Sequence, residues 1–425
     1  MRLIRLILSD FRSYHSLTWY PWARISVLVG PNGSGKTNLL EAVSLLTPGR
    51  GLRGARMADL ARHGATGGWA VAGRFSSAEG ETDIGTGTAP EGGGGRAGEY
   101  PEHYPGDRPG DHRPGDRPGE RPGDRPSDQP GDRPGDRSGN HHRPGERRVF
   151  RLDGEAPRSQ AEIAARVAAV WLTPQMDRLF QEALSGRRRF LDRLVWALEP
   201  GHAREIAAHD SAMAQRNRLL AEGRTDPAWL AGLEDAMARH AVAATASRAT
   251  LVAHLNATLA AGAAEPFPAA HLALVCPIAE RLEAAPALEV EDWLRAGLAG
   301  TRARDAAAGS AALGAHRTDL AMSDAATRHP AALASTGEQK TLLVGLILGH
   351  AALIAEARGT APLLLLDEPA VHLDPERRAA LFAALARLPA QTLITGTDAG
   401  IFAPLRGAAE LLRTGEGKLL SESEF

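Results

Sequence analysis

Two kinds of apolar spacing alternate along the chain, and together they predict an α/β protein. Residues 25–29 and 362–366 are short and almost wholly apolar. Such runs are typical of strands in a parallel sheet that is buried on both faces. Residues 2–8 alternate between apolar and polar side chains, which predicts a half-exposed strand. Further strands are expected at 17–20, 69–75, 149–152, 167–172 and 391–395, with a closing hairpin at 411–420.

Helical spacing dominates the middle of the chain and recurs near its end. Helices are expected at 38–46, 159–165, 186–198, 203–220, 227–259, 291–304, 335–357 and 375–387. We therefore expect a mainly helical second lobe at 186–305, between an N-terminal part (1–185) and a C-terminal part (306–425) of one α/β lobe. The longest apolar stretch, 342–354, contains glycine and histidine and is too short to span a membrane.

Residues 80–147 differ in character from the rest of the chain. The tetrapeptide Pro-Gly-Asp-Arg recurs there in degenerate form, first at 105–108. A repeat without apolar members cannot form a core, so we expect a disordered insertion at the tip of a hairpin. Aspartate and arginine nearly balance, which argues against a basic DNA-binding tail. We interpret the segment as a tolerated loop expansion.

Composition limits the possible partners and compartments. The chain has 425 residues and a formal net charge of −2, so any nucleic-acid contact must come from a local basic face. A single cysteine, Cys276, excludes an internal disulfide and a cysteine-based zinc site. This usage fits the cytoplasm, and the arginines in the first apolar run argue against a signal peptide.

A phosphate-binding loop follows the strand at 25–29 and precedes a helix. It consists of Gly30, Pro31, Asn32, Gly33, Ser34, Gly35, Lys36 and Thr37, the Gly-x-x-x-x-Gly-Lys-Thr pattern. Its N–H groups and the helix N-terminus are expected to face a polyphosphate. Lys36 would reach the β- and γ-phosphates, and Thr37 would bind Mg²⁺. The sequence therefore predicts binding of ATP or GTP with Mg²⁺.

Two carboxylates follow the leucine strand at 363–366, which has the form of a Walker B element. Asp367 would hold Mg²⁺ through water. Glu368 would act as the general base on the water that attacks the γ-phosphate. The two acids could instead end a strand in solvent, but together with Lys36 and Thr37 they favour a catalytic site.

The segment Ser335-Thr-Gly337-Glu338 predicts a helix N-terminus with a capping box, Ser335 at N-cap and Glu338 three residues on. Its free N–H groups also make a second candidate anion site. Because one chain does not need two such sites for one nucleotide, we expect a dimer in which Ser335 faces the γ-phosphate held by the other subunit.

These motifs, with Leu373-Asp374, resemble those of ABC-type ATPase heads. More narrowly, the chain resembles the RecF family of bacterial recombination and repair proteins. The resemblance is carried by residues 10–14, 35–42, 188–192, 215–220, 314–320 and 335–340. It spans nearly the whole chain apart from 80–147. It implies an SMC-like ABC ATPase head with mixed sheets and a helical second lobe.

The resemblance also implies function. It indicates an ATP-dependent homodimer that binds DNA at single-strand/double-strand junctions and gaps, in recombinational repair, replication restart and the SOS response. Mediator partners and the RecA recombinase are implied partners, and a membrane is not. Gln175 matches a loop that senses Mg²⁺ and γ-phosphate, Asp374 a loop that crosses the dimer interface, and Arg12 a position beside the phosphates. The resemblance implies a DNA-dependent ATPase. A histidine common in transporter ATPases is missing from Thr395-Gly-Thr-Asp398, so we expect its turnover to be slow.

Candidate DNA contacts are less specific. Arg187, Arg188 and Arg189 form the best basic cluster, although a helix would spread them over different faces. Lesser candidates are Arg216, Arg218 and Arg317, and His316 is expected to be structural. Two other functions stay open. One is a transporter-energising ATPase subunit, which the signature sequence and the helical lobe disfavour; the other is a nucleotide switch that does not hydrolyse.

Overall fold

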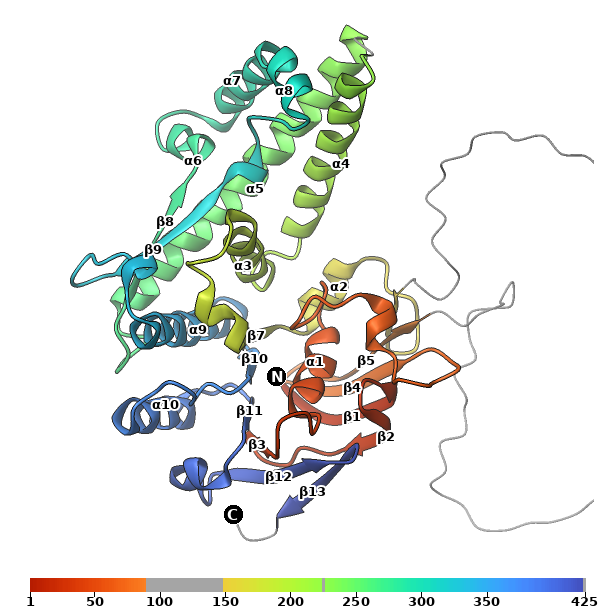
Figure 1. The fold of residues 1–425 in the computed structure, drawn as a ribbon, viewed down its shortest axis with the longest axis vertical. Helices are drawn as coiled ribbons and strands as arrows, with labels where there is room; N and C mark the ends of the chain where they lie inside the picture. The colour runs from red at the N-terminus through yellow and green to blue at the C-terminus, as the bar shows by residue number, and fades with distance from the viewer. Residues whose placement is uncertain (89–147, 224–225, 423–425) are drawn as a thin grey trace, which may run out of the picture.

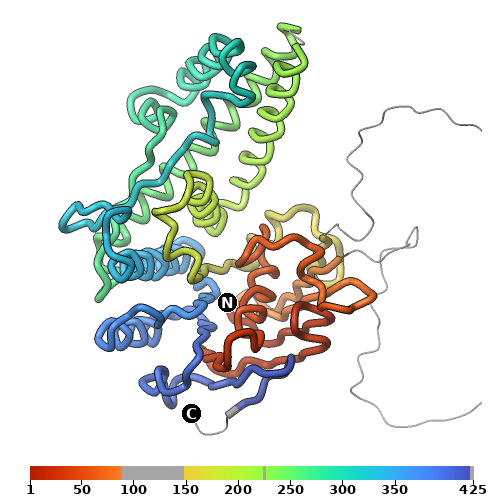
Figure 2. The backbone as a smooth tube through the Cα atoms, in the orientation of Figure 1, coloured from red at the N-terminus to blue at the C-terminus, as the bar shows by residue number. Residues whose placement is uncertain are grey.

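The computed structural model of the chain describes residues 1–88, 148–223 and 226–422. Two lobes are evident in Figure 1, a sheet-containing lobe and a mainly helical one. Figure 2 shows that the chain leaves the first lobe once, forms the second, and returns, so that both ends of the described chain lie in the sheet-containing lobe. A large apolar core fills the sheet-containing lobe and continues into the adjoining part of the helical lobe, and a second, smaller core lies among the helices.

The first sheet is an antiparallel meander at the N-terminal end of the chain. Its strands are β1 (Arg2–Phe11), β2 (Tyr14–Trp19), β4 (Ala70–Ser77), β5 (Gly80–Thr88) and β6 (Arg148–Leu152), in the order β2-β1-β4-β5-β6. Alternation along β1 places Leu6 and Leu8 in the core, as expected for a strand with one covered face.

The second sheet combines strands from both ends of the sequence. It consists of β3 (Ile25–Val29), β7 (Ala169–Leu172), β10 (Leu363–Leu366), β11 (Thr392–Gly396), β12 (Ala409–Gly415) and β13 (Lys418–Glu422), ordered β13-β12-β3-β11-β10-β7. All neighbours are parallel except β12 and β13. Both faces are covered, so β3, β7 and β10 are apolar throughout apart from Ser26.

Helices cover this sheet and join it to the rest. Helix α1 (Lys36–Leu45) contacts strands of both sheets, and α9 (Thr336–Arg358) packs on β7. Also in this lobe are α2 (Gln160–Arg166), α10 (Pro375–Arg387) and the short 3-10 turns η1 (Met57–Leu60), η2 (Pro174–Arg178) and η5 (Ala399–Leu405). Helix α9 is long and apolar enough to cross a membrane, but 78% of its apolar window is buried inside the protein. It is a core helix.

The second lobe is built around one long helix. Its elements are α3 (Leu184–Trp196), α4 (His202–Ala221), α5 (Pro227–Ala260), α6 (Pro277–Leu282), α7 (Ala287–Gly300), α8 (Arg302–Ala308), η3 (Ala315–Arg317), η4 (Ala331–Leu333), and the paired strands β8 (Ala270–Val275) and β9 (Asp319–Asp324). Helix α5 contacts α4 and α7 in this lobe and also α9, so it joins the two lobes.

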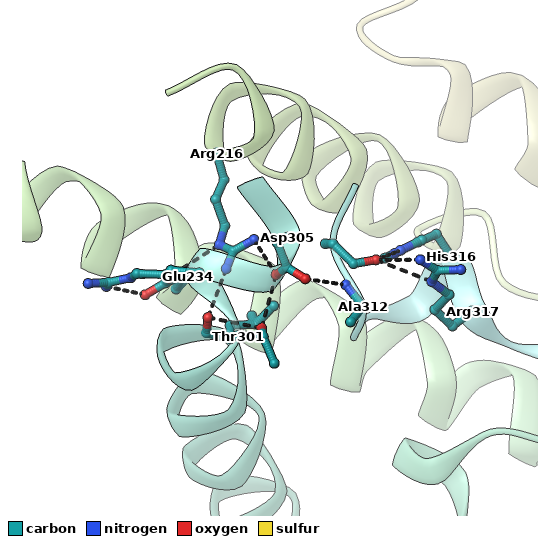
Figure 3. Close-up of polar contacts among 10 residues, drawn as sticks. Arg216, Glu234, Thr301, Asp305, Ala312, His316 and Arg317 are labelled. Atoms are coloured by element: carbon teal, nitrogen blue, oxygen red, sulfur yellow. Dashed lines mark hydrogen bonds and ion pairs between the residues drawn. The ribbon is translucent and has the colours of Figure 1, made fainter. Parts of the chain in front are cut away.

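Buried ion pairs hold the helical lobe together. Arg216 on α4 donates to Glu234 on α5 (3.0 Å), to Asp305 on α8 (2.9 Å) and to the carbonyl of Leu298 (2.7 Å). Figure 3 shows these groups converging from separate helices. All three charged side chains are buried, and each is neutralised by a partner as burial requires.

Three sequence expectations are corrected here. Strand β5 occupies Gly80–Thr88, so the insertion begins later than residue 80. The helix expected at 291–304 is two helices, α7 and α8, which meet at Thr301. The stretch 342–354, expected to be too short to span a membrane, belongs to α9, whose bounds are close to the expected 335–357 and whose apolar window is long enough to do so.

Other expectations are extended or stay untested. Thr88 pairs with Arg148, which confirms that the two flanks of the insertion form a hairpin, while the disorder expected within it concerns 89–147, outside the described residues. The predicted lobe boundary at 305 precedes β9, yet β9 pairs with β8 inside the second lobe. Local periodicity does not encode this long-range pairing.

Candidate nucleotide-binding site

One group of site residues lies at the carboxyl ends of four neighbouring parallel strands. The glycine loop follows β3, Thr395 lies on β11, Asp367 follows β10, and Gln175 follows β7. Parallel strands end at the same edge of a sheet, and open α/β sheets bind ligands at this edge. Residues separated by hundreds of positions are thereby gathered into one region.

The glycine loop has a backbone shape that only glycine tolerates at Gly35. Its φ is +103°, and a Cβ there would lie 2.7 Å from Ser13 Oγ and 2.9 Å from Tyr14 Oη. The Tyr14 hydroxyl donates a hydrogen bond to the Gly35 carbonyl (3.0 Å), and burial raises the Tyr14 pKa. The β1–β2 hairpin therefore supports the loop from behind.

Lys36 is held inside the loop. Its Nζ donates to the carbonyls of Gly30 (2.8 Å) and Pro31 (3.0 Å), and its side chain is buried. Burial lowers the Lys36 pKa, while the charges of Glu368 and Asp367 act in the opposite direction. A polyphosphate beside this ammonium group would add the negative charge that favours its protonated form.

The glycine loop and the Walker B strand are joined through one carboxylate oxygen. Asp367 Oδ1 accepts hydrogen bonds from Thr37 Oγ1 (2.9 Å) and Thr395 Oγ1 (2.8 Å). The Thr395 hydroxyl also accepts from the Glu368 N–H (2.9 Å). A hydroxyl and a carboxylate are hard oxygen ligands of the kind that Mg²⁺ binds, so the donor set fits this ion.

Thr395 is a site residue that motif analysis missed. It lies in the strand order between the strands that lead to the glycine loop and to Asp367. In the sequence, Thr395 is marked only by its position near the end of an apolar strand. This position points to the site only when the order of the strands in the sheet is known. Glu368 itself has φ +48°, an uncommon backbone conformation of the kind that clusters at functional sites.

Arg12 is bound to helix α1. Its Nε and Nη2 donate to the two oxygens of Glu41 (2.8 and 2.9 Å), and Nη1 donates to the carbonyl of Asp59 (2.7 Å). The Glu41 side chain is buried and also pairs with Arg53 at 3.5 Å. The structure thus places Arg12 one helical turn from Thr37, and its contact with phosphate stays a prediction.

Gln175 is exposed on η2, directly after β7. The same turn carries Asp177, which accepts from Lys340 on α9 (3.0 Å). Lys340 is almost fully buried, so this ion pair is shielded from solvent. It ties the Gln175 turn to the helix that Ser335 begins.

The capping box at the start of α9 is confirmed. Ser335 Oγ accepts from the Glu338 N–H (3.3 Å), and Glu338 Oε2 accepts from Ser335 N (2.8 Å) and Oγ (2.7 Å). These hydrogen bonds from Ser335 lower the Glu338 pKa. Ser335 and Glu338 are exposed.

The Asp374 segment lies beside this helix end. An added Cβ on Gly337 would lie 3.7 Å from Arg377 Nη1, and Asp374 caps α10 by accepting from Arg377 N–H (2.8 Å). Asp374 is exposed. Among the described residues, no hydrogen bond or ion pair joins Ser335, Gly337, Glu338 or Asp374 to the glycine loop. They form a second exposed group in this chain.

The candidate DNA arginines differ in availability. Arg187 is engaged by both oxygens of Asp319 (2.6 and 2.9 Å), and Arg188 is half-buried. Arg189 is exposed, with no ion-pair partner among the residues that the structure describes. Arg216 is fully buried and cannot contact DNA from this position. Of the predicted cluster, Arg189 is the exposed side chain.

The other lesser candidates also have partners. Arg218 pairs with Glu222 at 2.8 Å on the surface of α4, and Arg317 donates to the Ala311 carbonyl. His316 hydrogen-bonds the same carbonyl at 3.0 Å, and burial lowers its pKa to about 4. Figure 3 shows His316 and Arg317 together beside Ala312. These contacts fit the structural role expected for His316.

The phosphate loop, the Walker B carboxylates and the serine-capped helix, carried on this two-lobed architecture, define an ABC-type ATPase head. Residues 25–80 match a family model described as "AAA domain, putative AbiEii toxin, Type IV TA system". The chain is 41% identical to the DNA replication and repair protein RecF of Mesorhizobium japonicum, over 97% of this chain and 96% of that protein. It is 40% identical to RecF of Rhizobium meliloti, over 98% of each. The chain belongs to the RecF family.

Solved structures agree with this fold. A structure described as the recombination mediator protein RecF-ATPrS in the RecFOR pathway superposes with a TM-score of 0.77, at 19% identity over 99% of this chain and 98% of that one. A second, described as RecF-ATP in the same pathway, gives 0.74 at 18% identity over 99% of both chains. At these identities the likeness establishes the architecture.

Proposed function

We propose that this protein is an ATP-gated DNA-binding protein of recombinational repair and replication restart, and a slow DNA-dependent ATPase. Its relatives are named as DNA replication and repair proteins, and two structural neighbours are described as RecF with nucleotide in the RecFOR pathway. The observation that carries the proposal is the shared Asp367 oxygen, which joins Thr37 of the phosphate loop to the Walker B strand.

Each site residue has a proposed role. The loop N–H groups and Lys36 bind the triphosphate, and Thr37, Asp367 and Gln175 hold the Mg²⁺ ion. When bound, Mg²⁺ neutralises charge that develops on the phosphates. Glu368 accepts the proton of the attacking water. Thr395 orients Asp367 through its hydrogen bond.

The gate is a homodimer. Ser335, Gly337 and Asp374 are separate from the glycine loop of their own chain, so they are placed to serve the triphosphate held by a second copy. Binding free energy from ATP would then favour the closed dimer, and hydrolysis would release it. If ATP increases the affinity of the dimer for DNA by some factor, thermodynamic linkage requires DNA to increase the affinity for ATP by the same factor.

In the cell, we place this dimer in the cytoplasm at single-strand/double-strand junctions and gaps, where with mediator proteins it would help to load RecA during the SOS response. Arg189 supplies one exposed positive charge for such contacts. If phosphate contacts dominate, affinity for gapped DNA should fall steeply as salt increases.

Two variants at one position test the dimer. Ser335→Thr keeps a hydroxyl at N-cap, whereas Ser335→Arg places a bulky cation where the second subunit must approach. We expect size analysis with ATP to show dimers for the parent and Ser335→Thr and monomers for Ser335→Arg. Monomer binding of ATP should be unchanged in both. An ATP-dependent dimer of Ser335→Arg as stable as the parent's would contradict the shared site.

Phosphate release separates an enzyme from a passive switch. With gapped DNA present, we expect release above that of the protein alone, and no release from Lys36→Arg protein. If the parent binds ATP and dimerises but releases no phosphate under either condition, the protein is a nucleotide switch that does not hydrolyse.

A further inference from the structure

A cavity of about 590 Å³ lies where the two lobes meet, outside the nucleotide site. Its walls come from α2, β7, α3, the start of α4 and the segment that follows α1. Most of the lining is apolar and small, including Ala164, Ala168 and Ala203. A volume of this size suits a single small ligand.

The charged side chains that line this cavity are all arginines, and two tryptophans also line it. Trp171 and Trp196 line it, and their indole nitrogens are buried and have no hydrogen-bond partner among the described residues. A buried donor without a partner costs about 1–3 kcal/mol, so such groups call for an acceptor. Both nitrogens are closed to solvent in this conformation, so an acceptor in the cavity would reach them only if the lining side chains moved.

Positive charge accompanies these donors. Arg193 stacks over the Trp171 ring, 4.6 Å from its centroid, and among the described residues its hydrogen-bond acceptor is Met176 Sδ at 3.5 Å. Burial lowers the Arg193 pKa to about 9, so the guanidinium still carries its charge at neutral pH. Arg204 lies at the exposed side, in the first turn of α4, whose N-terminus has no side-chain cap. No carboxylate is among the described residues that line the cavity.

We propose that this inter-lobe cavity binds an aromatic anion, its ring among the alanines and tryptophans and its charge toward Arg193, Arg204 and the start of α4. The mostly apolar walls favour a ring over a bare inorganic ion, and the arginines favour an anion over a neutral hydrocarbon. Free nucleotides and aromatic carboxylates share this chemistry.

Residues that line the cavity also contact the turn that carries Gln175 of the nucleotide site. Trp171 lies on β7 four residues before Gln175, and Arg193 contacts Met176 in the Gln175 turn. A ligand that draws Arg193 toward its own charge would loosen that contact and shift the turn. This consequence rests on the proposed function, whereas binding in the cavity does not.

Binding is tested on the full chain without ATP, with 8-anilinonaphthalene-1-sulfonate as the aromatic anion and N-phenyl-1-naphthylamine as its uncharged counterpart. We expect saturable, one-to-one binding of the sulfonate with energy transfer from tryptophan, and at least about tenfold weaker binding of the amine. Adenosine monophosphate and indole-3-acetate are then added as competitors, and displacement by either identifies the preferred anion. If neither competitor displaces the sulfonate, the probe binds nonspecifically, and this result would overturn the proposal.

Three variants locate the probe. Ala164→Trp fills the cavity, and Arg204→Glu reverses the charge at its rim without touching the core. Arg189→Glu is the matched control, because it makes the same charge change on α3 outside the cavity. We expect the first two to weaken binding at least tenfold and the control to bind as the parent does. Because Arg204 is exposed, its variant keeps the test decisive if Ala164→Trp does not fold. Equal binding by Arg204→Glu and Arg189→Glu would overturn the proposal.

Discussion

Thr37 donates a hydrogen bond from its hydroxyl to Asp367 Oδ1 at 2.9 Å, although 330 positions separate the two residues in the sequence. The contact joins the first turn of α1 to the end of β10. Because Thr395 donates to the same oxygen, Asp367 is held in one orientation at the sheet edge. Four predictions follow from this site and from the buried contacts that support it.

The first prediction concerns Asp367. Asp367→Asn keeps the shape of the side chain but removes its charge and replaces one oxygen with a donor, so Mg²⁺ should no longer be held beside Thr37. We expect ATP-driven phosphate release to fall at least about 100-fold. Asp398→Asn is the control, because Asp398 follows β11 but only caps η5. An equal loss of phosphate release in both variants would mean that Asp367 is not required to hold Mg²⁺.

Glu368→Gln should separate ATP binding from hydrolysis. The amide cannot accept a proton from water, so we expect hydrolysis to fall by about 10²–10⁴-fold while ATP still binds. The dimer should then persist with ATP in size analysis for much longer than the parent dimer. Glu376→Gln, an exposed change in the first turn of α10, should behave as the parent. A Glu368→Gln protein that hydrolyses normally would exclude Glu368 as the base.

The helical lobe should depend strongly on Arg216. Arg216→Ala leaves Glu234 and Asp305 buried without this partner, and breaking such a pair costs about 3–5 kcal/mol. Arg218→Ala removes an exposed pair on the same helix and should cost about 0–1 kcal/mol. Denaturant unfolding followed by circular dichroism measures both. Similar free energies of unfolding for the two variants would refute the importance of the buried network.

Stability should fall in mild acid because of His350. Burial lowers the His350 pKa from 6.5 to about 3, with Nε2 donating to the Leu194 carbonyl (3.0 Å) and Nδ1 left without a partner. The unfolded chain therefore binds a proton below about pH 6.5 that the folded chain refuses. The contribution of neutral, buried His350 to the free energy of unfolding is therefore fully present above about pH 6.5, and it is lost as the pH falls toward 3.

The measurement is the free energy of unfolding at pH 7 and at about pH 5, compared between the parent and His350→Gln. A glutamine amide can still donate to the Leu194 carbonyl but does not titrate. The free energy of unfolding should therefore decrease less between pH 7 and about pH 5 in His350→Gln than in the parent. His63→Gln, at an exposed position, should decrease as the parent does. Parallel decreases in all three proteins would exclude His350 as a source of acid sensitivity.

The amino-acid sequence by itself determined the motifs that depend on a few neighbouring residues. The glycine loop, the leucine strand with Asp367 and the capping box of Ser335 each need only a few consecutive side chains. Helix α10 and strand β3 have the bounds that their apolar spacing predicts. In these segments local propensity and tertiary packing favour the same conformation.

The tertiary structure alone decided which distant residues meet. The order β3-β11-β10-β7 brings Thr395 to Asp367, and the packing of α1 pairs Glu41 with Arg12. It also pairs β8 with β9 and buries the indole nitrogens of Trp171 and Trp196 without a hydrogen-bond partner among the described residues. Apolar periodicity records which face of an element is buried, but not which element covers it. That choice is made by packing over the whole chain, so these contacts could not be predicted from the sequence.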